Sequence, residues 1–321
     1  MLGVNEDDVG LGDAFTASPS LTSALSPAAL VWRRLRRDRV AIVALVAVLL
    51  VTVVALTAPL LVDLVGAPGP NVQNSATLSD IGLPSGPSSS HLLGVDELGR
   101  DVFSRVVYGA RISLSVAFIA TGLAAVLGTL VGLCAGFFEG VVDSLLSRTM
   151  DVVLAFPVML LALGMASACS TGKGCAAGLV KPGFGTVVFV LTFAGWPRFG
   201  RLVRGQTLSL RHHGFVDAAR GLGSTNKTIL FTELLPNLVG VVTVYATLMV
   251  PTNILFEAAL SFLGVGIQPP NPSWGAMIAE AIPVFQSAWW FLVFPGMALI
   301  VTSLAFNLLG DALTDAVGQN Q

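Results

Sequence analysis

A run of 19 uncharged residues, from Val40 to Ala58, most constrains what this chain can fold into. As a helix rising 1.5 Å per residue it would measure about 28 Å, close to the roughly 30 Å hydrocarbon core of a bilayer. Pro59 marks its far end, and five arginines stand directly before it: Arg33, Arg34, Arg36, Arg37 and Arg39. Because such residues collect on the cytoplasmic side, the run predicts a first transmembrane helix that starts in the cytoplasm.

Five further apolar stretches follow, at about 112–138, 145–168, 183–203, 236–260 and 288–310. Across the chain only 11% of residues are charged, whereas soluble domains carry about a quarter. This composition excludes a soluble enzyme, and a net charge of −2 offers no basic surface for nucleic acid. We therefore predict an all-α polytopic membrane protein with six transmembrane helices. Trp196-Pro197-Arg198 interrupts the fourth stretch, which makes it the weakest of the six.

Lysine and arginine positions test this arrangement. With a cytoplasmic start, twelve of these residues fall in cytoplasmic segments and five fall outside. This bias obeys the positive-inside rule, so both termini are predicted to be cytoplasmic. The predicted units are a disordered cytoplasmic tail at 1–26, a basic interfacial segment with the first helix at 27–62, an extracytoplasmic loop at 63–111, a five-helix core at 112–312 and a C-terminal tail at 313–321.

The second stretch carries Gly128, Gly132 and Gly136, a spacing that lets another helix approach closely. Glycine is also simply common in membrane helices. The cytoplasmic segment 205–236 predicts two short amphipathic helices around a turn at Gly223, which can adopt a left-handed conformation. Their apolar stripes, which include Phe215, Ala218, Ala219 and Leu222, would have to be buried against the membrane surface or a partner protein.

The order Asp217-Ala218-Ala219, three residues, Gly223 and then Leu235-Pro236 resembles the EAA loop of ABC-importer permeases, with Asp217 replacing the usual Glu. Three more blocks resemble the C-type subunits of oligopeptide and dipeptide permeases: RRLRRDRVAIVAL, HLLGVDELGRDVFSRVVYGARIS and ALSFLGVGIQPPNPSWGAMIAE. The resemblance covers about residues 30–312. It departs at Glu233, where the general EAA pattern has an apolar residue.

The resemblance implies a type I ABC-importer permease fold, and a subunit of the bacterial cytoplasmic (inner) membrane that forms half of a pathway for di- or oligopeptides. It implies a homologous second permease, two ATPase subunits and an extracytoplasmic solute-binding protein as partners. The ATPase-coupling residues would be Asp217, Ala218, Ala219, Gly223, Glu233 and Pro236. The sequence has no G-x-x-x-x-G-K-[ST] loop, so ATP and Mg would be bound by the partners, and the chain itself would be no enzyme and hold no cofactor.

Asp151 and Glu257 are the carboxylates that fall in the predicted spans and are candidates for the translocation path. For Asp151 the favoured alternative is a buried pair with an arginine such as Arg198 or Arg201. Glu257 could meet a peptide's amino terminus or be a solvated or interfacial carboxylate. Arg100 and Asp101 recur in the family signature and are expected to brace the outer loop.

Cys169 and Cys175 lie in ACSTGKGC on the predicted outer side, where disulfides persist. We expect them to be bonded and Cys134 to be free; two free thiols are the alternative. No Cys/His spacing predicts a metal site, and His212 and His213 are interpreted as a solvated pair.

Two other function classes fit the sequence less well. A membrane-embedded enzyme would need a nucleophile–base or metal constellation, yet no histidine falls in the spans. An ion-coupled transporter usually shows inverted repeats and several midplane carboxylates, which this chain lacks. Within the ABC class, nickel or other small solutes remain alternatives to peptides.

Overall fold

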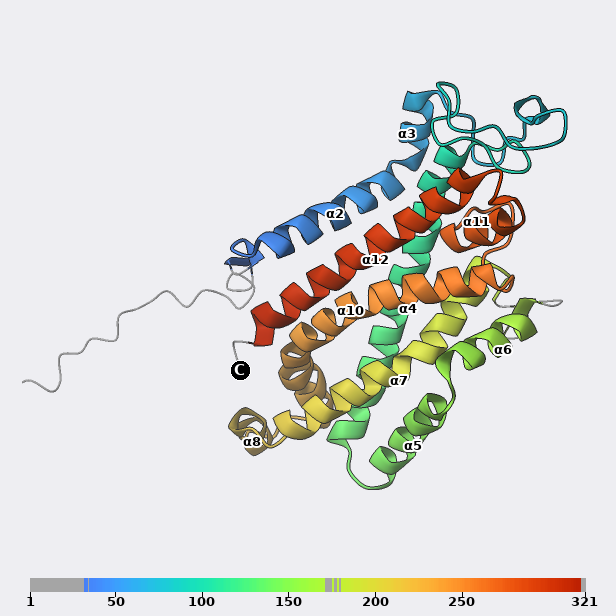
Figure 1. Ribbon diagram of the computed structural model, residues 1–321. Helices are drawn as coiled ribbons and strands as arrows, with labels where there is room; N and C mark the ends of the chain where they lie inside the picture. The colour runs from blue at the N-terminus through green and yellow to red at the C-terminus, as the bar shows by residue number, and fades with distance from the viewer. Residues whose placement is uncertain (1–31, 34, 171–174, 176–177, 179, 319–321) are drawn as a thin grey trace, which may run out of the picture.

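The computed structural model describes residues 32–33, 35–170, 175, 178 and 180–318, so the expected tail at 1–26 lies outside the described residues. Helices build this part of the chain (Figure 1), and its β structure is limited to isolated bridges. The helices are α2 (Arg39–Leu56), α3 (Ala58–Val65), α4 (Val102–Phe137), α5 (Val141–Ala155), α6 (Val158–Ser170), α7 (Phe184–Leu210), α8 (Gly214–Gly221), α9 (Asn226–Thr228), α10 (Leu235–Phe262), α11 (Trp274–Ala281) and α12 (Trp289–Gly318).

Among the described residues, four helical segments are long and apolar enough to cross a membrane: α2, α4, α12 and the continuous segment Asn226–Phe262 that contains α10. A fifth span forms if α5 and α6, which meet at an angle of 87°, count as one. The sharp bend lies at Pro157, which cannot continue the hydrogen-bonding of a helix. α7 falls outside this group because Arg198, Arg201 and Arg204 lower its hydropathy, although it runs unbroken through Pro197.

Several helix ends differ from the sequence-based boundaries. α4 begins ten residues before residue 112, because the Asp101 carboxylate accepts a hydrogen bond from the backbone N–H of Ser104 (2.8 Å) and caps it. α7 extends into the segment expected as a loop from residue 205, and α12 continues past residue 312 to Gly318. These three helices are therefore longer than the hydropathy pattern indicated, whereas the stretch expected at 145–168 is divided into α5 and α6.

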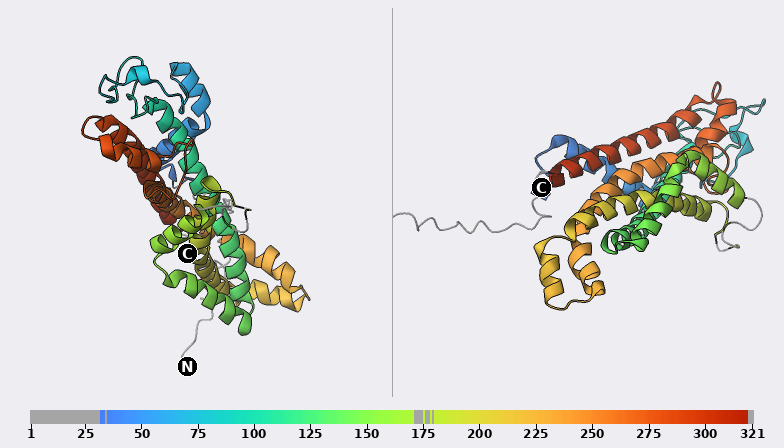
Figure 2. Two further views of the ribbon diagram at one scale, coloured as in Figure 1. Left: turned by 90° about the vertical axis from the view of Figure 1, so that its right-hand side faces the viewer. Right: turned by 90° about the horizontal axis from the view of Figure 1, so that it is seen from below.

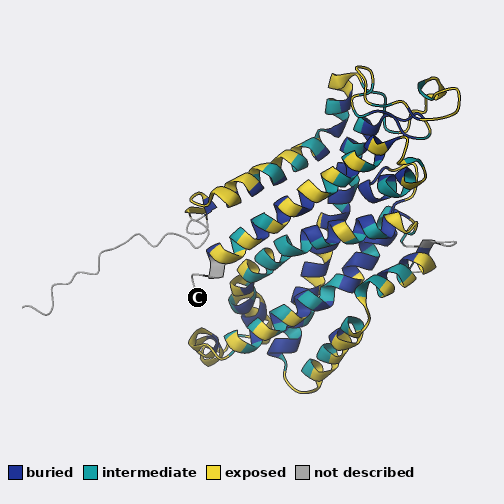
Figure 3. Ribbon diagram, in the orientation of Figure 1, coloured by how far each residue is buried: buried dark blue, intermediate teal, exposed yellow. Residues whose placement is uncertain are grey.

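α4 is the central helix of the bundle, and half of its most apolar window is buried inside the chain, against 22% for α2 (Figure 3). Its glycine ridge lies directly against α7. A Cβ atom on Gly136 would come within 2.6 Å of the Thr207 Cβ, and one on Gly132 would meet the Gly200 carbonyl oxygen. The glycines therefore permit a backbone approach that no larger residue allows.

Long helices set up two ends of the molecule (Figure 1). The start of α2, the end of α12 and α8 lie at one end, whereas the segment between α3 and α4, α11 and the start of α7 lie at the other. Exposed large apolar side chains cover much of the helix surface between these ends, such as Val43, Leu50 and Leu160. An apolar belt between two polar ends is the surface that a bilayer requires.

A cluster of charged side chains fastens the α3–α4 segment to the bundle. Buried Asp96 accepts hydrogen bonds from Arg100 Nε (2.6 Å) and Arg105 Nη1 (2.5 Å). Both arginines also donate to Glu280 of α11, each at 2.8 Å. Arg100 thus braces this segment, and Asp101 does so as well, because its Oδ2 accepts a hydrogen bond from His91 Nδ1 at 2.8 Å.

Candidate functional site

The site with the strongest sequence signal is the hairpin of residues 211–234, here called the α8 hairpin. Two residues, His212 and His213, separate the end cap of α7 from α8, and the hairpin projects from one end of the bundle (Figure 2). Asp217 lies in the first turn of α8, where a carboxylate is favoured by the helix dipole. Its side chain is 66% exposed and lies 3.5 Å from Arg220 Nη1.

One face of α8 is anchored in the chain's own core. Val216 is fully buried and Ala219 is buried beside it. They belong to an apolar cluster with Leu133 and Phe137 of α4 and Val203 of α7. This anchoring fixes the helix on the ends of α4 and α7.

The opposite face of α8 is free in this chain. Leu222 is 87% exposed, and Phe215 and Ala218 are also exposed. The expected single stripe of Phe215, Ala218, Ala219 and Leu222 is therefore divided: Ala219 faces inward and the other three face outward. Val216, rather than Phe215, occupies the inward position one turn before Ala219.

Gly223 ends α8 with a φ of +80°, a left-handed conformation that strains residues with a Cβ. Its N–H donates to the Arg220 carbonyl (2.9 Å), and the Ser224 N–H donates to the Ala219 carbonyl (3.0 Å), closing the helix end. Thr225 then caps α9 through a hydrogen bond from the Thr228 N–H at 3.3 Å.

The second limb of the hairpin contains a π-helix, Ile229–Leu234, which leads directly into α10. Ile229, Leu230 and Leu234 are buried in the same cluster as Val216. This apolar stripe is thus covered by the chain itself, and not by the membrane surface or a partner as expected. Glu233 is half-buried and Pro236 is exposed in the first turn of α10.

Asp151, a candidate for the translocation path, lies on α5 beside α7. Its Oδ1 accepts a hydrogen bond from Arg201 Nη2 at 2.6 Å, and both side chains are about half exposed. Arg201 is one of the two partners that the sequence favoured, but the pair is about half exposed and not buried.

Glu257 is placed differently from the alternatives considered for it. It is fully buried on α10, where Ser113 of α4 donates to its Oε2 (2.7 Å) and Ser261 donates to its Oε1 (2.8 Å). In this chain it is therefore neither solvated nor interfacial, and its contacts join α4 to α10.

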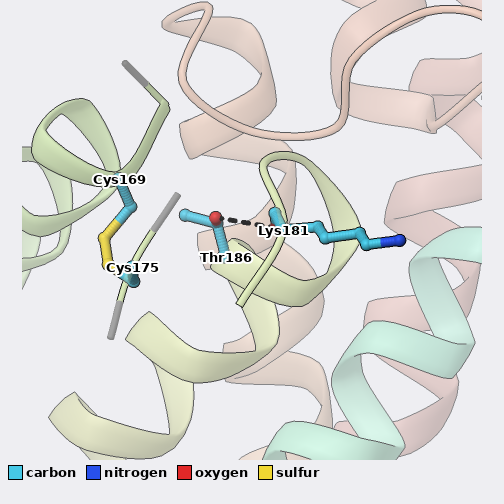
Figure 4. Close-up of a disulfide and its surroundings, with 4 residues drawn as sticks. All are labelled: Cys169, Cys175, Lys181 and Thr186. Atoms are coloured by element: carbon cyan, nitrogen blue, oxygen red, sulfur yellow. Dashed lines mark hydrogen bonds between the residues drawn. A yellow bond between two sulfur atoms is a disulfide. The ribbon is translucent and has the colours of Figure 1, made fainter. Parts of the chain in front are cut away.

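A disulfide joins Cys169, at the end of α6, to Cys175, and their Cα atoms lie 4.7 Å apart (Figure 4). Cys134 on α4 is free and half-buried. In the described part of the chain, no group of three or more His, Cys, Asp or Glu side chains could hold a metal ion.

Sequence reasoning named Arg201 as a partner of Asp151 but missed two further ion pairs at the end of α7. Besides Arg201, Arg204 binds Asp143 and Arg211 binds Glu139. Asp143 and Asp151 lie eight residues apart on α5, whereas Glu139 lies in the turn before that helix.

Long apolar helices packed in a bundle, with an anchored hairpin between α7 and α10, define a polytopic membrane protein. The chain belongs to the family of binding-protein-dependent transport system inner membrane components, whose model matches residues 128–320. A second family model, the N-terminal transmembrane domain of oligopeptide transport permease C, matches residues 26–77. Membership in this family implies ATPase and binding-protein partners.

Individual relatives agree with this family. The chain is 37% identical to the dipeptide transport system permease protein DppC of Alkalihalophilus pseudofirmus over 92% of this chain and 90% of that protein. It is 41% identical to the glutathione transport system permease protein GsiD of Escherichia coli O6:K15:H31, over 89% of this chain and 88% of that protein.

The fold also has a solved counterpart. A chain of the inward-facing MetNI methionine ABC transporter aligns with a TM-score of 0.54 at 18% identity. The alignment covers 66% of this chain and 96% of that one. It supports a shared arrangement of the core helices.

Proposed function

We propose that this chain forms half of the translocation pathway of an ATP-driven importer of short peptides, including di- and tripeptides. The two relatives belong to transport systems for dipeptides and for glutathione, which is itself a tripeptide. Their sequences are 37% and 41% identical to this chain over about nine-tenths of its length. A homologous second permease forms the other half, two ATPase subunits bind on the hairpin side, and a solute-binding protein docks at the opposite end.

The α8 hairpin couples the chain to the ATPases. The observation that carries this assignment is the contrast between the two faces of α8: Val216 is fully buried in the chain's own core, whereas Leu222 is 87% exposed. An exposed leucine on a rigidly anchored turn is costly to leave in water, and it supplies an apolar anchor for a partner's groove. Asp217, Ala218 and Gly223 flank it on the same surface, with Glu233 and Pro236 on the second limb.

The membrane topology we propose has six crossings with both termini in the cytoplasm of a bacterium. α5 and α6 together make the third crossing and α7 the fourth. Two observations support it: the α8 hairpin, the start of α2 and the end of α12 share one end of the molecule, and that end carries most of the arginines (Figure 1).

The test replaces Leu222 by arginine and measures how much ATPase co-purifies with equal amounts of permease. Ile81→Arg is the matched control, because Ile81 is 80% exposed at the opposite end of the molecule. We expect Leu222→Arg to reduce ATPase recovery about tenfold or more, as for loss of an interface anchor, and Ile81→Arg to leave it unchanged. Undiminished recovery with Leu222→Arg would refute the coupling role of this surface.

A further inference from the structure

Three acidic side chains between the end of α4 and the middle of α5 bind three arginines of α7. We call this set the acid–arginine ladder: Glu139 with Arg211, Asp143 with Arg204, and Asp151 with Arg201. From Glu139 to Asp151 the residue numbers of the acids increase, while those of their arginine partners decrease from Arg211 to Arg201. The ladder therefore joins two antiparallel stretches of the chain. A pattern of this kind fixes the register of two helices as well as their distance.

The central rung has the most constrained geometry. Arg204 donates from Nε to Asp143 Oδ1 (2.6 Å) and from Nη2 to Asp143 Oδ2 (2.8 Å), a two-point contact between planar groups. Ser147, one turn further along α5, donates to the same Oδ1 at 3.0 Å. Both charged side chains are less than one-third exposed, so water screens this pair less than it screens Asp151 and Arg201.

The ladder holds the last part of α7, and α7 carries the α8 hairpin. Arg211 caps the end of α7, contacts Glu139 and also donates to the Gly136 carbonyl of α4 at 3.3 Å. α8 begins three residues later, at Gly214. α7 therefore links the α8 hairpin to α5 through the rungs.

We infer that Asp143, through its two-point contact with Arg204, is a positioning residue: it sets the direction in which α7 presents the α8 hairpin and makes α5 follow the hairpin's motion. This inference rests on the proposed coupling function of that hairpin. α5 meets α6 at the 87° bend, so a movement of α5 reaches the far half of the third crossing. Loss of the rung should uncouple ATP hydrolysis from transport while leaving the ATPase bound.

The experiment reconstitutes the complete importer in vesicles and measures labelled peptide taken up per ATP hydrolysed. Asp143→Asn removes the charge and keeps the size; Asp311→Asn, an exposed aspartate on α12, is the matched control. We expect Asp143→Asn to lower uptake per ATP about fivefold to tenfold while ATPase recovery stays at the wild-type level. Asp143→Arg alone and Arg204→Asp alone should each lower the peptide uptake per ATP. The double variant that carries both substitutions should restore it.

The outcomes separate this inference from the proposed function. If no ATPase co-purifies with the wild-type chain, the coupling function itself is refuted. If the wild type recovers ATPase and Asp143→Asn transports at the wild-type ratio, only the positioning role is overturned. If Asp143→Asn is lost from the membrane, the exchanged pair decides: restored uptake per ATP supports the role, and an assembled but uncoupled importer contradicts it.

Discussion

Arg100, at the end of the segment after α3, donates a hydrogen bond from Nη2 to Glu280 Oε2 of α11 at 2.8 Å, across 180 positions of sequence. Arg105 donates to the same oxygen. Glu280→Gln should leave two arginines sharing the single charge of Asp96 and lower the free energy of unfolding by about 1–3 kcal/mol. Thermal unfolding in detergent measures this. Asp80→Asn, an exposed acid in the same segment, is the control, and equal melting temperatures for the two variants would contradict the account.

Glu97, beside this cluster, should make the stability depend on pH. Burial raises the pKa of Glu97 above its ordinary value of 4.5, and the negative charges of Glu280 and Asp96 raise it further. A carboxyl whose pKa is higher in the folded state binds its proton more tightly there. Its contribution to stability is therefore fully present below pH 4.5 and is lost as pH rises through the folded-state pKa. As pH rises above 4.5, the free energy of unfolding of the wild type should fall relative to that of Glu97→Gln. A difference in unfolding free energy that stays constant with pH would refute this prediction.

The α4–α7 contact predicts a steep response to side-chain size. Gly132→Leu would drive a side chain into the Gly200 carbonyl and Val203, and should destabilise the protein by about 3 kcal/mol or more through overpacking. Gly122→Leu, on the same helix with nothing within 4 Å of its added Cβ, should be tolerated. The amount of folded protein recovered from membranes after size-exclusion chromatography measures both. Equal recovery of the two variants would show that the ridge is not a packing surface.

The disulfide between Cys169 and Cys175 predicts a simple labelling pattern. In SDS without reductant, an alkylating reagent should label only Cys134, and after reduction it should label all three cysteines. Mass spectrometry of the labelled protein counts the modified sites. Three labels before reduction would mean that the bond does not form in the membrane.

Much of this architecture could be read from hydropathy and glycine spacing. The apolar run that begins at Val40 predicts α2, and the Gly128–Gly136 ridge predicts the close contact between α4 and another helix. Both patterns depend on local sequence alone. Gly223 is a similar case, because its φ of +80° is a local requirement of the turn. The division of α8 into Val216-inward and Leu222-outward faces could not be read in the same way, because it depends on what α4 and α7 present to it.

Charged residues were the least predictable. The pair of Arg201 with Asp151 was expected, but the acidic partners of Arg204 and Arg211, which lie 61 and 72 residues earlier in the sequence, were not. Glu257 illustrates the same difficulty, because its serine partner Ser113 lies 144 positions away. Burial of a charge is decided by distant partners, and a single sequence does not show which partners fold against each other.

Uptake of a labelled dipeptide into vesicles that contain the assembled importer tests the central claim most directly. The vesicles hold ATP inside and binding protein outside, and uptake is compared for wild type and Leu222→Arg. The account predicts that uptake requires ATP, the ATPase subunits and the binding protein, and that Leu222→Arg abolishes it. Dipeptide uptake by the permease subunits alone, driven by an ion gradient without ATPase subunits, would contradict it.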